Sequence, residues 1–284
     1  MSNQFAITDT LSLPNSQVRI PRLGFGVYRS LQHKCVSSCL EALRAGYRHI
    51  DTAQFYANES EVGAAVRESG LPRDEICITT KIVSPGGSPQ ATYEKLLGSV
   101  RKITGDDGGF VDLFLIHSNR SGPAGRRQLW QALERLLEEG RTRSIGVSNY
   151  GVQHIEEMKA YAKVWPPHVN QIELHPWCQQ RVIVEYCKRH GIVVEAYSPL
   201  VRNHKANDAT LVGLAQKYEK TTTQILIRYS LQKGWVPLPK SDDPSRIAAN
   251  ADVYGFEIDP DDMSVLDSLD RGSAGAIVEA VANE

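Results

Sequence analysis

The stretch from residue 111 to residue 149 decides the fold. It opens with the apolar run VDLFLIH (111–117) and closes with the run SIGVSN (144–149). Between the two runs, apolar residues recur at helical spacing: Leu129, Trp130, Leu133, Leu136 and Leu137. Gly140 follows, at a position where glycine commonly ends a helix. Two short apolar runs joined by an amphipathic helix are typical of a βαβ unit, in which the two strands are parallel.

The same unit recurs along the whole chain. Eight apolar runs are candidate strands: residues 23–28, 48–51, 76–81, 111–117, 144–149, 169–173, 192–197 and 235–240. Most are short and apolar throughout, as expected for parallel strands covered on both faces. The segments between them carry helix signals, such as Gly46 after one apolar stripe and Asp259-Pro260 ahead of another. The pattern predicts an α/β fold, a (β/α)8 TIM barrel, with a doubly wound parallel sheet as the alternative.

Two further features concern the limits of this barrel. Residues 5–7 and 17–20 flank the turn-forming Pro14-Asn15-Ser16, which predicts a short N-terminal β-hairpin that closes one end of the barrel. No linker or low-complexity tract divides the sequence, so we expect residues 1–284 to form a single barrel domain.

Composition restricts the class of protein before any motif is considered. With 32 Lys and Arg against 33 Asp and Glu, the net charge is −1, so we expect neither nucleic acid nor an anionic membrane as a partner. No apolar run approaches the length of a membrane span, and the first residues lack a secretory signal pattern. Five cysteines are too few for a disulfide framework and indicate reduced thiols. We expect a cytoplasmic monomer that acts on a small molecule.

Polar residues stand where the apolar runs end: Asp51, Lys81, His117, Ser148, Asn149, Gln171, Tyr197, Lys240 and Ser241. In a (β/α)8 barrel the carboxyl ends of the strands meet at one mouth, where the active sites of such barrels lie. Tyr56 follows Asp51 by one short loop. We therefore expect Asp51, Tyr56, Lys81 and His117 to share one pocket.

These four residue types suit the reduction of a carbonyl group. Tyrosine is a poor acid at neutral pH, but a charged lysine beside it favours the phenolate and lowers its pKa. Asp51 paired with Lys81 would keep the ammonium group charged and fixed in place. Tyr56 could then donate a proton to the oxygen that becomes an alkoxide, while His117 orients that oxygen. Since no side chain carries a hydride, the set predicts a nicotinamide cofactor.

Several blocks of sequence resemble the signature of the aldo-keto reductase superfamily. They are GYRHIDTAQFYANE (46–59), Thr80-Lys81, DLFLIH (112–117), SIGVSNY (144–150) and LPKS (238–241). The resemblance runs from about residue 18 to about residue 270 and implies a (β/α)8 barrel that binds NADPH or NADP+. It implies reduction of aldehydes or ketones to alcohols, with Tyr56 as general acid, Lys81 and Asp51 tuning it, and His117 orienting the carbonyl.

The resemblance also implies a set of cofactor-binding residues: Ser148, Asn149, Gln171, Tyr197, Ser198, Lys240, Ser241, Arg246 and Asn250. The first three match residues that hold the nicotinamide carboxamide, and Tyr197 matches the residue that stacks on the ring. Lys240, Ser241 and Arg246 match residues that hold the 2′-phosphate, and Asn250 matches one near the adenine. Asp242 and Asp243 would repel a phosphate, so we expect them to face solvent or cap the following helix.

Other functions stay open at this point. Some barrels of this family serve as non-catalytic regulatory subunits, and the four residues do not exclude that role. A Schiff-base aldolase would use Lys81 as its nucleophile, but needs that amine neutral, which Asp51 opposes. Gly24 and Gly26 lack the third glycine of a dinucleotide fingerprint, so we expect no Rossmann fold. A His and a Cys in the run HPWC (175–178) are too few for a metal site, and we expect none.

The chain departs from the family pattern around the substrate. Tyr28 and Ser118-Asn119 replace aromatic residues that are common there, and the loop after Lys81 lacks a common Trp. Ala249 stands where Glu is frequent, and the tail after Leu269 is short and rich in small residues. These departures predict a less aromatic and more open pocket.

Overall fold

A closed ring of parallel strands forms the centre of the computed structural model, which describes residues 5–279 and 281. The eight strands of the sheet pair in chain order, from β3 to β10. Backbone N–H groups of Gly24 and Gly26 donate to the carbonyls of Pro237 (3.1 Å) and Pro239 (3.0 Å), which joins the first strand to the last. The predicted (β/α)8 barrel is therefore confirmed, and the doubly wound sheet is excluded.

Each strand of the ring falls within or beside its predicted apolar run. The strands are β3 (Phe25–Gly26), β4 (His49–Asp51), β5 (Cys77–Ile82), β6 (Leu113–Ile116), β7 (Ile145–Ser148), β8 (Val169–Glu173), β9 (Val193–Tyr197) and β10 (Val236–Pro237). All are buried over nearly their full length, which explains why their sequences are apolar on both faces.

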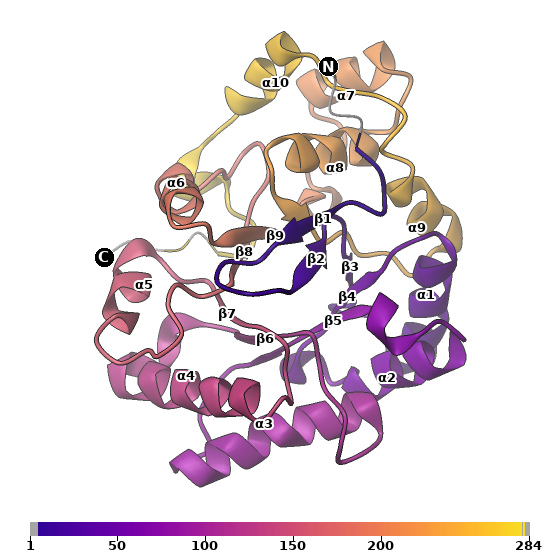
Figure 1. Ribbon diagram of the computed structural model, residues 1–284. Helices are drawn as coiled ribbons and strands as arrows, with labels where there is room; N and C mark the ends of the chain where they lie inside the picture. The colour runs from indigo at the N-terminus through magenta and orange to yellow at the C-terminus, as the bar shows by residue number, and fades with distance from the viewer. Residues whose placement is uncertain (1–4, 280, 282–284) are drawn as a thin grey trace.

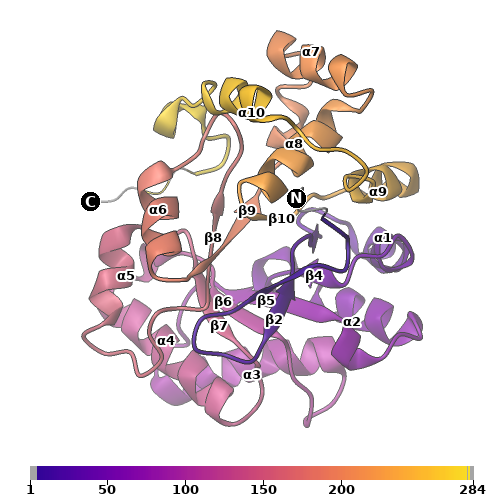
Figure 2. The same ribbon diagram turned by 45° about the horizontal axis from the view of Figure 1, so that its top comes forward.

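Helices surround the strands, as Figures 1 and 2 show. They are α1 (Gln32–Arg44), α2 (Glu59–Glu68), α3 (Pro89–Thr104), α4 (Gly122–Glu138), α5 (Val152–Met158), α6 (Arg181–Arg189), α7 (Ala209–Lys217), α8 (Thr222–Gln232), α9 (Pro244–Ala251) and α10 (Pro260–Asp267). Short 3-10 turns interrupt the loops: η1 (Gln54–Tyr56), η2 (Arg73–Glu75), η3 (Asn119–Ser121), η4 (Val201–Asn203) and η5 (Gly272–Gly275).

Local sequence sets the ends of these helices. Gly46 (φ +97°) and Gly140 (φ +70°) follow the last turns of α1 and α4 in a left-handed conformation that disfavours other residues. At the start of α10, the Asp259 side chain accepts a hydrogen bond from the Asp262 backbone N–H (2.9 Å), and Pro260 occupies the first turn. The capping signals read from the sequence are confirmed.

The apolar core has two layers. The larger lies between the strands and the helices and contains Trp130 and Leu133 of α4, both fully buried, as well as Cys35 and Cys39 of α1. The smaller fills the barrel interior near the amino ends of the strands, where Leu13 and Ile20 of the N-terminal segment meet side chains of five strands: Cys77, Leu113, Leu115, Val169, Val193 and Val236.

The N-terminal hairpin supplies that closure. Strands β1 (Thr10–Ser12) and β2 (Arg19–Pro21) pair antiparallel and lie across the barrel end (Figure 1). The hairpin is confirmed, but its first strand is not at residues 5–7. Asp9 prevents a strand there, because its carboxylate accepts from the Ala6 N–H (2.9 Å) and its own N–H donates to the Ala6 carbonyl (3.0 Å), forming a turn.

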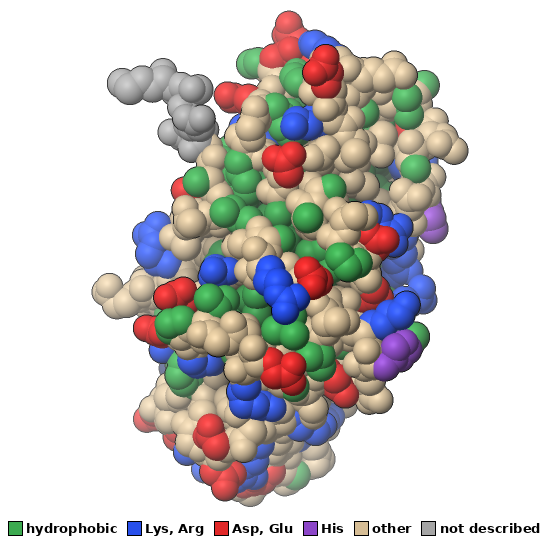
Figure 3. Space-filling view, turned by 90° about the vertical axis from the view of Figure 1, so that its right-hand side faces the viewer, with side chains coloured by type: hydrophobic (Ala, Val, Ile, Leu, Met, Phe, Trp, Pro, Cys, Tyr) green, Lys and Arg blue, Asp and Glu red, His purple; other side chains and the backbone are tan. Residues whose placement is uncertain are grey.

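The surface charges and the state of the cysteines are those expected from the composition. On the face drawn in Figure 3, basic and acidic side chains are interspersed. In the described part of the chain, no helix is long and apolar enough to cross a membrane. All five cysteines are buried free thiols, as expected for reduced cysteines.

Candidate active site

Asp51, Lys81 and Tyr56 come together at the carboxyl ends of β4 and β5. Lys81 Nζ donates to Asp51 Oδ1 (2.6 Å), to the Thr52 carbonyl (2.9 Å) and to the Tyr56 hydroxyl (3.4 Å). Lys81 is fully buried, and Tyr56 is carried by η1 directly after β4. Because Lys81 donates to the phenol oxygen, the hydroxyl proton of Tyr56 is free for another acceptor.

The pKa of Tyr56 differs from the expectation, whereas the charge of Lys81 agrees with it. Burial opposes the charged lysine, but Asp51, Tyr56 and Glu195 together outweigh it, and the pKa of Lys81 is raised. Burial also raises the pKa of Tyr56, and Lys81 acts in the opposite direction without overcoming it. The expectation of a lowered tyrosine pKa is therefore wrong for this structure. At neutral pH Tyr56 carries its proton and Lys81 carries its charge.

His117 completes the group from the end of β6. Its ring lies edge-on to the ring of Tyr56, with the centroids 5.7 Å apart. Burial and the positive charge of Lys81 lower the pKa of His117 to about 3. The imidazole is therefore neutral at physiological pH and can donate one hydrogen bond without adding charge to the pocket.

A buried polar network lies directly behind Asp51. Strand register sets Gln171 of β8 beside Glu195 of β9, and Gln171 Nε2 donates to Asp51 Oδ2 (2.9 Å) and to Glu195 Oε2 (2.7 Å). With both amide hydrogens used, Gln171 can offer only an acceptor, Oε1, to a ligand in the pocket that it lines. Burial and the nearby Asp51 raise the pKa of Glu195 to about 8. Glu195 was missed in the sequence, although a lone carboxylate inside an apolar run was the available signal.

The strand ends next to Gln171 carry the other predicted nicotinamide residues. Ser148 donates to the Gln171 carbonyl (2.8 Å), and Tyr197 donates to Asn149 Oδ1 (2.9 Å). Asn149 (φ 59°) and Ser198 (φ 52°) have left-handed backbones, an uncommon conformation that often marks functional sites. All four line the same pocket as Gln171, so the structure brings them together as predicted.

The loop from Lys240 to Asp243 leads into α9, which carries Arg246 and Asn250. Asp243 caps α9 by accepting from the Arg246 N–H (2.9 Å), as expected. Asp242 neither faces solvent nor caps the helix: it accepts from Ser30 (2.6 Å) and Ser38 and forms an ion pair with Lys240. That expectation is wrong, because two hydroxyl groups and a lysine surround the carboxylate.

Of the predicted phosphate residues, only Lys240 lines the pocket. The Arg246 side chain is 73% exposed on α9, while Ser241 and Asn250 are buried beside it. Three of the residues predicted to bind the adenosine end of the cofactor, Ser241, Arg246 and Asn250, therefore lie outside the lining of the pocket.

One pocket of about 630 Å3 joins the predicted catalytic residues to the predicted nicotinamide residues. It is lined by Asp51, Tyr56, His117, Gln171 and Lys240, among others. It also contains residues that sequence spacing did not indicate. Arg29 and Arg202 stack over the ring of Tyr28, with guanidinium carbons 5.3 and 5.7 Å from its centroid. The short tail also reaches the pocket, which Val278 and Glu279 help to line, so the tail does not leave this side uncovered.

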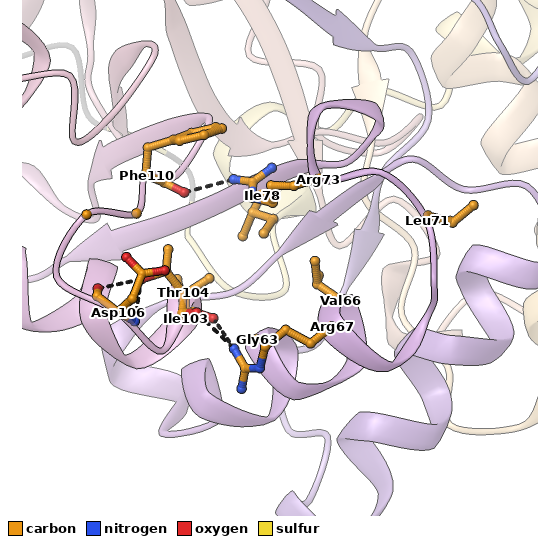
Figure 4. Close-up of a pocket in the computed structure, with 12 residues that line it drawn as sticks. Gly63, Val66, Arg67, Leu71, Arg73, Ile78, Ile103, Thr104, Asp106 and Phe110 are labelled. Carbon is orange, nitrogen blue, oxygen red and sulfur yellow. Dashed lines mark hydrogen bonds between the residues drawn. The ribbon is translucent and has the colours of Figure 1, made fainter.

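A second pocket, of about 600 Å3, lies at the other end of the barrel wall, between the last turns of α2 and α3 (Figure 4). Its two arginines are directed at main-chain carbonyls. Arg67 donates to Ile103 (3.0 Å), and Arg73 donates to Ile76 (2.6 Å) and Phe110 (2.9 Å). Arg73 also forms an ion pair with the buried carboxylate of Asp112 (2.7 Å). These contacts hold the loop before β6.

Comparison with known proteins identifies the family of the chain. The sequence model of the aldo/keto reductase family matches residues 36–271. The chain belongs to the aldo/keto reductase family.

Individual relatives cover nearly the whole chain. The glyoxal reductase of Bacillus subtilis is 37% identical over 267 residues, covering 94% of each chain. An aldo/keto reductase from Brucella melitensis has a crystal structure with a TM-score of 0.86, 38% identity, and coverage of 92% of this chain and 99% of that one. The Bombyx mori aldo-keto reductase solved in complex with NADP has a TM-score of 0.86, 30% identity and 96% coverage of each chain.

Proposed function

We propose that this protein is an NADPH-dependent reductase that converts aldehydes or ketones to alcohols, with Tyr56 as the general acid. The observation that carries the proposal is the Tyr56 hydroxyl held by Lys81 (3.4 Å), which is itself held by Asp51 (2.6 Å). The glyoxal reductase among the relatives and the NADP complex among the structural neighbours support this type of reaction.

The residues of the pocket fit a nicotinamide dinucleotide. Gln171 Oε1 can accept from a carboxamide N–H, and Asn149 and Ser148 lie beside it. The ring of Tyr197 offers a flat surface at the end of β9. Arg29, Arg202 and Lys240 supply positive charge for phosphates along one side, and Arg246 at the start of α9 suits a 2′-phosphate.

The bound cofactor would supply the hydride, and the side chains of this chain would do the rest. Neutral His117 would donate a hydrogen bond to the carbonyl oxygen and orient it towards Tyr56. Tyr56 would pass its proton to that oxygen as negative charge develops there. Charged Lys81, fixed by Asp51, would then stabilise the phenolate that Tyr56 becomes.

Two other functions are less well supported. A Schiff-base aldolase needs a neutral Lys81, whereas the raised pKa of Lys81 keeps that amine charged. Sodium borohydride with a carbonyl substrate and no cofactor would trap such an enzyme covalently, and we expect no trapping. A non-catalytic regulatory subunit has no need of Tyr56 with a free hydroxyl proton beside His117, and measurable turnover would exclude an inactive role.

The direct test is NADPH oxidation, followed by absorbance, across a panel of aldehydes, ketones and sugars. We expect turnover of aldehydes or ketones, with NADPH preferred to NADH. Absence of turnover with every carbonyl compound, despite tight binding of NADPH, would contradict the proposal and favour the regulatory subunit.

The proposal extends to the organisation of the protein. We propose that residues 1–284 form one domain and act as a cytoplasmic monomer. The hydrogen bonds that close β3 on β10, and five free thiols suited to a reducing compartment, support this proposal. A single unfolding transition and a monomeric mass in sedimentation are the expected results.

A further inference from the structure

Arg120 lies at the mouth of the active-site pocket. It belongs to η3, three residues beyond His117, and lines the same pocket as His117 and Tyr56. Its side chain is 75% exposed and its Nη2 donates to Glu279 Oε1 (2.9 Å). A cation that reaches the substrate side of the pocket is thus paired with a carboxylate from the C-terminal tail.

The tail backbone is held at this place by a different contact. The buried carboxylate of Glu173, at the end of β8, accepts from three consecutive backbone N–H groups: Ile277 (2.6 Å), Val278 (2.8 Å) and Glu279 (2.7 Å). Three charge-assisted hydrogen bonds at a buried site hold the tail firmly. The backbone of the tail therefore stays bound to Glu173 when the Glu279 side chain leaves Arg120.

Apolar side chains line the same pocket as Arg120 and the reacting groups. Phe55 (67% exposed), Val83 (40%) and Val278 (48%) line the pocket, and all three are unusually exposed for large apolar residues. Exposed apolar side chains gathered at a pocket mouth indicate a ligand surface. The pocket thus combines the proton donor Tyr56, exposed apolar side chains and Arg120, a cation paired with a carboxylate of the tail.

We propose that Arg120 determines specificity by binding the carboxylate of an aldehyde substrate whose middle portion is apolar, and that Glu279 occupies Arg120 until that substrate arrives. This inference rests on the proposed reductase function. An exposed ion pair contributes little to stability, so exchanging one carboxylate for another at Arg120 costs little. Arg is suited to this role because its planar guanidinium binds carboxylates through parallel N–H groups.

The test compares benzaldehyde with 4-carboxybenzaldehyde, which differ only in the carboxylate. The quantity measured is the ratio of kcat/KM for the charged aldehyde to kcat/KM for the neutral one. We expect Arg120→Met to lower this ratio by about two- to fivefold, the range of an exposed charge pair, and Glu279→Gln to raise it by a similar factor. The change should appear mainly in KM, since Arg120 does not touch the reacting atoms.

Arg181→Met provides the matched control. Arg181 also ties down the C-terminal region, through Asp270 (2.8 Å), but does not line the pocket. We expect the ratio to be unchanged in this variant. If Arg120→Met and Arg181→Met alter both aldehydes equally and leave the ratio unchanged, Arg120 is only a clamp for the tail and the inference is wrong. Failure of the wild type to reduce either aldehyde or any other carbonyl compound would instead contradict the proposed function.

Discussion

The two pockets of this barrel have nearly the same volume and very different chemistry. The pocket at the carboxyl ends of the strands, about 630 Å3, is lined by Asp51, which is almost fully buried and paired with the buried Lys81. The pocket between α2 and α3, about 600 Å3, has Arg67 and Arg73 bonded to main-chain carbonyls, with Arg73 also paired to Asp112. In the first pocket polar atoms are left for a ligand, and in the second the charged side chains hold a loop.

The difference shows that volume alone does not identify a functional site. At the strand ends, register brings Gln171 and Glu195 side by side, behind Asp51, so several polar groups converge from separate strands. Near α2 and α3 the two arginines, one from α2 and one from η2, bond to main-chain carbonyls, as buried main-chain groups require, and Arg73 also pairs with Asp112. Four predictions test this contrast.

Tyr56→Phe should have the largest effect. It removes the proton donor with little change in volume, and we expect kcat for carbonyl reduction to fall by about two to four orders of magnitude. NADPH affinity, measured by fluorescence titration, should hardly change. Tyr28→Phe is the matched control, because the two rings lie 4.9 Å apart in the same pocket. A comparable loss in both variants would mean that the hydroxyl of Tyr56 has no special role.

Arg246→Ala should weaken NADPH binding by about 10- to 100-fold, because hydrogen bonds to a charged group contribute about 1.5–3 kcal/mol. NADH lacks the 2′-phosphate, so its dissociation constant should stay the same. Arg67→Ala, in the second pocket, should leave both dissociation constants unchanged. Parallel weakening of NADPH and NADH by Arg246→Ala would contradict the assignment of this residue to the 2′-phosphate.

Glu195→Gln should stabilise the protein at alkaline pH. In the folded protein the pKa of Glu195 is about 8, whereas in the unfolded chain it is about 4.3. The folded state therefore keeps a proton that the unfolded state releases, and stability falls as the pH rises from about 4 to about 8. Gln cannot ionise and keeps an acceptor for Gln171, so we expect a gain of about 1–3 kcal/mol at pH 8 that disappears below pH 4. Urea unfolding at several pH values measures it, and a gain independent of pH would contradict the raised pKa.

The last prediction is that His117 produces no step in the pH profile of kcat/KM. Since the pKa of His117 is about 3, the imidazole stays neutral between about pH 5 and 8. We expect kcat/KM for carbonyl reduction to show no protonation step near pH 6.5 in wild type or in Arg67→Ala. A step near pH 6.5 that is lost in His117→Gln would show that a charged imidazole takes part.

Sequence alone predicted most of the architecture and the residues that meet at its mouth. The eight apolar runs became the eight strands, and Asp51, Lys81 and His117 lie at strand ends because parallel strands in a ring all end on the same side. The capping signals at Gly140 and Asp259 were equally readable, since a helix end is a local structure. These features depend on spacing along the chain, which the sequence contains directly.

Only the tertiary structure decided the charges and the contacts across the pocket. The pKa of Tyr56 is raised because burial outweighs Lys81, and no spacing encodes how deeply a phenol is enclosed. Asp242 is held by Ser30, which lies 212 positions away in the chain. Arg120 meets Glu279 from 159 positions away. Such pairs form because the barrel closes and the tail returns to its mouth, so their chemistry is a property of the fold.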